Sequence, residues 1–131
     1  MELVNGVSVF AGEINTSGDI QGHSPDILVS TDTTLTVDQC KGQVIYVTAT
    51  ATLTLPAVTD DGMLVTVYST TAAAVMVNPD DADRIVLNGA AGGGGKELTS
   101  DSQAGSFIVL HNDDADGWRT LGRSGVWTME A

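Results

Sequence analysis

Short apolar or alternating segments recur along the chain from residue 27 to residue 128, and turn-forming sequences such as NPDDAD, NGAAGGGGK and NDDADGW separate them. Successive side chains of an extended chain point to opposite faces, so alternation is typical of a β-strand with one buried face. Thr and Val, which strands favour, are frequent in these segments. We therefore expect about eleven strands, at residues 27–30, 34–37, 44–48, 52–55, 63–69, 75–78, 84–87, 97–99, 106–111, 118–121 and 126–128.

Helical patterns are missing from the sequence. No long window shows apolar residues at helical spacing between capping residues, and the Ala-rich stretch 72–74 follows two threonines. Many short strands at close spacing indicate an all-β fold, a compact β-sandwich or barrel.

The alternation also predicts the core. Leu35 and Val37 share one face of their segment, and Leu53 and Leu55 share one face of theirs. In residues 63–69 the interior set is either the odd or the even positions, and the odd set (Met63, Val65, Val67) is more apolar than Leu64, Thr66 and Tyr68. We expect the interior to be completed by Phe107, Val109 and Trp118.

Residues 1–24 have a different pattern, in which even positions from Phe10 to Gly22 are bulky apolar, threonine or glycine and odd positions from Glu13 are polar. This predicts an extended N-terminal arm, ended by Ser24-Pro25, before a β domain at residues 25–131. The apolar parity switches near Phe10, which indicates either a bulge at residues 11–12 or a separate short strand at residues 3–9. A single strand cannot bury its own apolar edge, so the arm should pack against other chains, and a flexible tail is the alternative. The residues expected to make these contacts are Val7, Val9, Phe10, Ile14 and Ile20.

Charge and cysteine content limit the partners and the compartment. Seventeen acidic and five basic residues give a net charge of −12, so we expect no nucleic-acid partner. No apolar run approaches the length of a membrane span, and the first residues lack the basic start of a signal peptide, so we expect no membrane partner and a mature protein that begins near Met1. The single cysteine, Cys40, excludes an intrachain disulfide and is expected to be a buried, inert thiol.

Two motifs fall short of binding sites. The segment GAAGGGGKE has Ala90 where a phosphate-binding loop needs its first glycine and Glu97 where it needs a hydroxyl, so it is read as a flexible connecting loop. In NDDADG, Asn112, Asp114 and Asp116 match the first ligands of a calcium loop, but Arg123 occupies the position of its bidentate glutamate. A hairpin turn between Leu110 and Trp118 is therefore the preferred interpretation.

The sequence gives no catalytic constellation. His23 and His111 lie on a polar linker and at a strand end, Cys40 has no neighbouring histidine, and no nucleophile-elbow pattern occurs. We expect no enzyme activity, no cofactor and no metal. Paired carboxylates for glycoside hydrolysis stay open, because their spacing in the fold decides that chemistry.

Three parts of the chain resemble one group of proteins. Residues 33–95 (TTLTVDQCKGQVIYV to NGAAGGGG), the ending VLHNDDADGWRTLGRSGVWT and the arm EINTSGDIQG are similar to small β-rich structural proteins of tailed bacteriophages. The resemblance implies a virion protein, made in the host cytoplasm, that is usually a homotrimer. A chain with one short arm and one domain fits a head decoration (cement) protein, which binds the major capsid protein on the outer capsid surface. The resemblance implies that the arm residues Val7, Val9, Phe10, Ile14 and Ile20 are its capsid or trimer contacts.

Two alternatives follow from the same resemblance or from the acidic residues. A trimeric head- or tail-fibre module would bind a receptor or glycan, and Trp127 or Tyr68, if exposed, would be its contacts. A glycan-degrading enzyme would need a cleft with two carboxylates.

Overall fold

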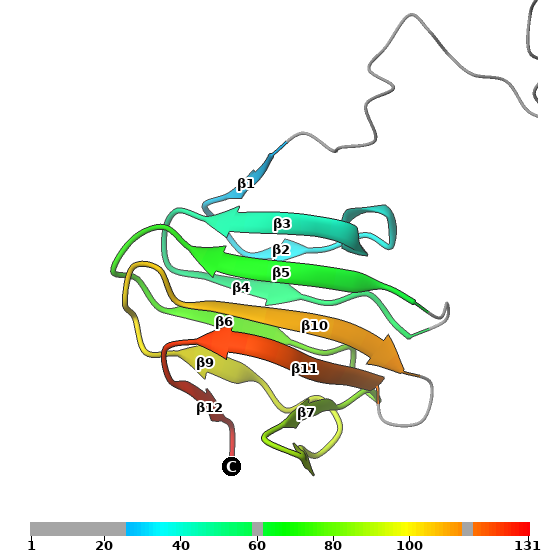
Figure 1. Cartoon of the computed structure of the whole chain (residues 1–131). Helices are drawn as coiled ribbons and strands as arrows, with labels where there is room; N and C mark the ends of the chain where they lie inside the picture. Colours follow the sequence, from blue (N-terminus) through cyan, green and yellow to red (C-terminus); the bar gives the residue numbers. More distant parts are fainter. Residues whose placement is uncertain (1–25, 59–61, 114–116) are drawn as a thin grey trace, which may run out of the picture.

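The computed structural model describes residues 26–58, 62–113 and 117–131, which form two β-sheets packed face to face (Figure 1). The larger sheet, drawn in front in Figure 1, has the strand order β1-β3-β5-β10-β11-β7-β8. Its strands are β1 (Ile27–Val29), β3 (Lys41–Val47), β5 (Leu64–Ser69), β10 (Phe107–Asp113), β11 (Gly117–Ser124), β7 (Ile85–Leu87) and β8 (Ala90–Ala91). The fold is an all-β sandwich, as the sequence predicts.

The smaller sheet has the order β12-β9-β6-β4-β2. Its strands are β12 (Trp127–Met129), β9 (Leu98–Ser100), β6 (Val75–Asn78), β4 (Ala51–Thr54) and β2 (Thr33–Thr34). The first half of the domain alternates between the layers, so β1, β3 and β5 are parallel neighbours in one sheet while β2, β4 and β6 are parallel neighbours in the other. The connections therefore cross between sheets instead of forming hairpins.

The observed strands overlap all of the predicted ones, with two local corrections. The segment 34–37 leaves β2 after Thr34, because Gln39 N–H donates to the Thr36 carbonyl and Thr36 N–H donates to Gln39 Oε1 (2.9 Å). These local bonds start a short 3-10 helix at Asp38–Cys40 instead of continuing the ladder.

The second correction is β8, which lies in the segment predicted to be a flexible connecting loop. Ala90 and Ala91 pair antiparallel with Leu87 and Val86. Asn88 and Gly89 both have positive φ, 54° and 79°, which is the conformation of a tight hairpin turn. The Asn88-Gly89 pair is the feature of the sequence from which this hairpin could have been predicted.

The core fills the space between the two sheets. Leu35, Leu53, Leu55, Met63, Val65, Val67 and Trp118 are buried, as predicted from alternation. Val37 is only partly buried and packs against this core. Cys40 is fully buried, and burial raises the pKa of its thiol to about 12, so the thiol stays protonated and unreactive at neutral pH.

The prediction for β10 was wrong. Ile108 and Leu110 are fully buried, whereas Phe107 and Val109 lie on the opposite face. Ile108 pairs with Val67 and Leu110 with Val65, and directly paired residues share a face of the sheet. Because Val65 and Val67 point into the core, Phe107 and Val109 must point out of it.

Candidate interaction surface

The outer face of the seven-stranded sheet carries an unusual set of apolar side chains. Strand pairing aligns Leu28, Tyr46, Tyr68 and Phe107 in one row from β1 through β3 and β5 to β10. A second row next to it aligns Val44, Thr66 and Val109. We call the apolar members of these two rows the aromatic face, which consists of Leu28, Val44, Tyr46, Tyr68, Phe107 and Val109.

The rings of the aromatic face contact one another. Tyr46 and Tyr68 meet edge to face with centroids 5.8 Å apart, and Tyr68 stacks on Phe107 at 6.4 Å with an interplanar angle of 11°. Both geometries are favourable for aromatic pairs. The three rings are partly buried by this packing, whereas Leu28 at the sheet edge is 69% exposed. The face is therefore pre-ordered, and a partner would immobilise few additional rotamers on binding.

A third row continues the same outer face towards the other end of the strands. Here Leu64 of β5, His111 of β10 and Arg119 of β11 are neighbours in the ladder. These three rows of the outer face are thus apolar or basic apart from Thr66. Asp113, at the end of β10, is the only acidic residue within the described strands of this sheet.

The outer face of the five-stranded sheet has a different composition. Strand pairing aligns Thr52, Met76, Thr99 and Thr128 in one row and Thr34, Thr54 and Asn78 in the next. We call this set the threonine face. Asp32 borders it, because its Oδ1 accepts a hydrogen bond from Thr52 N–H at 2.9 Å. Hydroxyl and amide side chains of this kind are ordinary solvent-facing residues of a sandwich.

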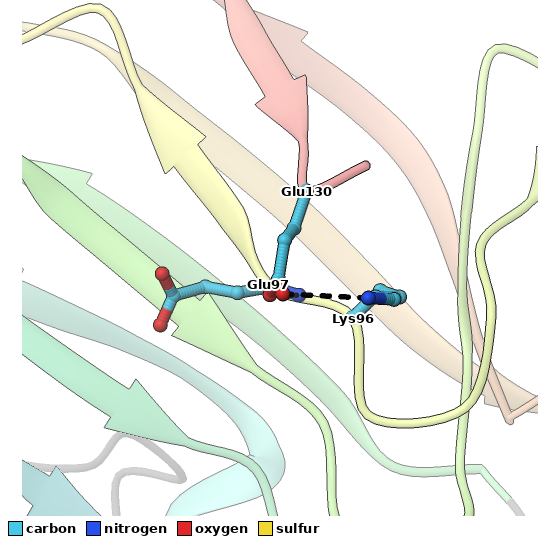
Figure 2. A network of polar contacts seen from close by, with 3 residues as sticks. All are labelled: Lys96, Glu97 and Glu130. Atoms are coloured by element: carbon cyan, nitrogen blue, oxygen red, sulfur yellow. Dashed lines mark hydrogen bonds and ion pairs between the residues drawn. The ribbon is translucent and has the colours of Figure 1, made fainter.

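Three charged residues gather where β9 begins and β12 ends (Figure 2). Lys96 Nζ lies 3.4 Å from Glu130 Oε2, and Glu97 N–H donates to Glu130 Oε1 at 3.4 Å. Partial burial, Glu130 and Asp32 together raise the pKa of Glu97 above its ordinary value. The Glu97 carboxylate points away from the Lys96–Glu130 ion pair in Figure 2, so the two carboxylates do not converge on a common point. This is not the arrangement that a two-carboxylate hydrolase needs.

The candidate calcium ligands are only partly placed. Asp114 and Asp116 lie outside the described residues, but Asn112 is buried and its Oδ1 accepts a hydrogen bond from Met63 N–H at 2.6 Å. β10 and β11 form the predicted hairpin, paired from Phe107–Ser124 to Asp113–Gly117. Within residues 26–58, 62–113 and 117–131, no three His, Cys, Asp or Glu side chains gather as a metal site.

The structure places the other predicted contacts as follows. Val7, Val9, Phe10, Ile14 and Ile20 lie outside the described residues, as does His23. Trp127 is not an exposed glycan contact, because it is only 4% exposed and its indole N–H donates to the carbonyls of Phe107 and Ser124, each at 3.1 Å. Tyr68 is partly buried within the aromatic face.

The aromatic face escaped the sequence analysis, although a signal for it existed. Residues 44–47 and 107–110 are continuous apolar runs, VIYV and FIVL, whereas 51–54 reads ATLT. A continuous apolar run is typical of a strand that is buried on both faces. Both the odd and the even positions of these two runs are apolar, so alternation alone does not show that apolar side chains also lie on the outer face.

The chain matches no known protein family and no curated protein. No helix in the described part of the chain is long and apolar enough to cross a membrane. The functional argument therefore comes from the two faces and from the sequence resemblance.

Proposed function

We propose that this protein is a non-catalytic structural protein of a tailed-phage virion, a decoration protein that binds the outer surface of the head as a homotrimer. The observation that supports an assembly role is the aromatic face, a pre-ordered apolar surface on a small protein whose chain has a net charge of −12. Surfaces of this kind on soluble domains are typical of protein–protein contacts. The assignment to a phage head is based on the resemblance of residues 33–95 and 109–128.

The mechanism is stabilisation of the assembled shell by binding. A protein that binds the assembled shell and not its free subunits adds its binding free energy to the shell. The arm, with Phe10, Ile14 and Ile20 on one edge, supplies the contact with the major capsid protein. Three arms on one trimer raise the effective affinity through multivalency. The net charge of −12 per chain gives the decorated particle a charged outer surface that limits aggregation.

The test uses heads of the phage that carries this gene, prepared without this protein. The full chain, a variant lacking residues 1–22 and the double variant Phe10→Asp/Ile14→Asp are mixed with these heads, and bound protein is measured by co-sedimentation. The matched control is Asn15→Asp/Ser17→Asp, which adds the same charge on the polar edge of the arm. We expect the full chain and the control to bind and both other variants to lose binding. Equal binding by all four, or binding by none, contradicts the proposal.

The aromatic face also supports one second candidate, a trimeric fibre module that binds glycans. Tyr46 and Tyr68 present rings on which a sugar could stack. A glycan array separates the two functions. A decoration protein gives no specific signal, whereas a glycan-binding module gives a signal that Tyr68→Ala abolishes.

A further inference from the structure

We propose that copies of this chain pack against one another through the aromatic face, which leaves the threonine face on the outside of the oligomer. The inference rests on the homotrimer of the proposed function and assigns its interface to the domain, where the sequence pointed only to the arm. The occupant of the aromatic face is a second copy of this chain.

The first argument is the chemistry of the surface. Tyr and Phe side chains are enriched at the centres of protein interfaces, and Tyr46, Tyr68 and Phe107 form one contiguous group. Large exposed aliphatic residues lie on both sides of this group. Leu28 on β1 is 69% exposed, and Leu121, at the bulge in β11, is 62% exposed. Packing against another copy removes these residues from water.

The second argument is charge, and it identifies a second copy as the occupant. Two chains that each carry −12 repel one another unless they meet where acidic side chains are missing. Residues 27–29, 41–47, 64–69 and 107–112 contain no Asp or Glu. A contact through the threonine face would instead bring Asp32, Glu97 and Glu130 of each copy together. The aromatic face is therefore the part of the described surface where like copies can approach.

The third argument is the position of the aromatic row on the sheet. The row runs to the outer edge of the sheet at Leu28 of β1 but stops at Phe107 on the inner side, where Ser124 of β11 follows. An apolar row that reaches only one edge suits a contact in which the edge of one copy packs on the face of the next. Such a contact forms a closed ring when the rotation between copies is that of the proposed trimer, and an open filament otherwise. The described part of the chain begins at Asp26, directly before β1 at this same edge.

The experiment measures the mass of the full chain in solution by light scattering and sedimentation velocity. The variant Tyr46→Asp/Val109→Asp puts two charges on the aromatic face, and the control Thr52→Asp/Thr99→Asp puts two charges on the threonine face. We expect a trimer for the unmodified chain and for the control. We expect the aromatic-face variant to dissociate at least about 30-fold more readily, which is the effect of losing one strong interface residue.

A second variant guards against misfolding. Leu28 is mostly exposed within one chain, so Leu28→Asp should leave the domain folded, which circular dichroism and thermal unfolding check, and should still weaken the trimer. A monomeric unmodified chain overturns the inference, and so does a folded aromatic-face variant that stays trimeric. If the aromatic-face variants dissociate but the unmodified trimer does not bind heads, the interface stands and the decoration function fails. If heads bind the protein but aromatic-face charges leave the trimer intact, the function stands and the interface assignment fails.

Discussion

The two outer faces of the sandwich are made from strands whose inner halves are alike. Leu53 and Val77 of the five-stranded sheet and Ile45 and Ile108 of the seven-stranded sheet are all fully buried between the layers. The outward positions differ, because one sheet presents threonines and the other presents aromatic rings. The fold needs only the inner halves, so the outward residues can differ according to what each face contacts, and the aromatic face is the one that we propose contacts a second copy.

The two faces also differ in how much apolar side-chain surface a single chain leaves exposed to water. Threonine hydroxyls on the five-stranded sheet are satisfied by water at no cost, so the threonine face is complete in a single chain. Tyr46, Tyr68 and Phe107 keep part of their apolar surface exposed, and covering that surface would be favourable. The threonine face therefore needs no further contact, whereas the proposed contact between copies would cover the aromatic face.

The largest expected effect on stability distinguishes two neighbouring residues that face opposite sides of β10. Ile108→Ala removes a fully buried side chain and should lower the free energy of unfolding by about 2–5 kcal/mol. Val109→Ala, one residue later, changes the outer face and should cost less than about 1 kcal/mol when the protein is dilute enough to be monomeric. Urea unfolding followed by circular dichroism measures both.

The concentration dependence makes this test sharper. If the aromatic face is an interface, the decrease in the free energy of unfolding caused by Val109→Ala should become larger as protein concentration increases. At high concentration the folded protein is a trimer, and the substitution then also weakens the contacts between its copies. The cost of Ile108→Ala should be large at every concentration. Equal costs for the two variants in dilute solution would contradict the assignment of the faces.

These two residues also show what the sequence could and could not predict. Strands with Thr-apolar alternation, such as Thr52–Leu53–Thr54, fix their inward face by themselves, and the prediction for them was right. FIVL is apolar at both parities, so only pairing with Val65 and Val67 decides that Ile108 and Leu110 face inward. That pairing, and the parallel order β1-β3-β5, depend on contacts between segments far apart in the chain, which local patterns do not encode. The aromatic face was hidden in the same ambiguity, because two of its residues, Phe107 and Val109, had been assigned to the core.

A smaller effect is expected where the chain passes from the aromatic-face sheet to the threonine-face sheet. Asp101 accepts hydrogen bonds from Ser106 Oγ (2.6 Å) and from Val126 N–H (2.9 Å), which lies between β11 and β12. These bonds lower the pKa of Asp101 below its ordinary value, with the Ser106 bond as the largest cause. Asp101→Asn should therefore lower the melting temperature at pH 7, by less than Ile108→Ala does.

The pH dependence follows from the direction of that shift. A carboxyl whose pKa is lower in the folded state contributes stability that is complete above its ordinary pKa, near 3.9, and is lost as the pH falls through the folded value. The difference in melting temperature between Asp101→Asn and the unmodified chain should therefore shrink below about pH 4. Asp26→Asn, at an exposed position before β1, is the control and should change little. If the difference in melting temperature stays constant from pH 7 to pH 3, the charge of Asp101 does not stabilise the connection between the two sheets.

The smallest effect is expected beside the threonine face, and it has the opposite sign. Burial, Glu130 and Asp32 raise the pKa of Glu97, so its charged form is less stable in the folded chain than in water. Glu97→Gln should therefore stabilise the domain at pH 7 by a few tenths of a kcal/mol, a small value because solvent screens the charges around this partly exposed group. The gain should disappear as the pH falls through the raised pKa towards the ordinary value of about 4.3, because the unmodified Glu97 then becomes neutral as well.

Glu130→Gln is the matched control, since it removes a charge from the same cluster but also weakens the ion pair with Lys96 and should not stabilise. Urea unfolding at pH 7 and pH 4 measures both variants. If Glu97→Gln destabilises the domain at pH 7, the Glu97 carboxylate makes favourable contacts at the border of the threonine face. That result would weaken the charge contrast between the two faces.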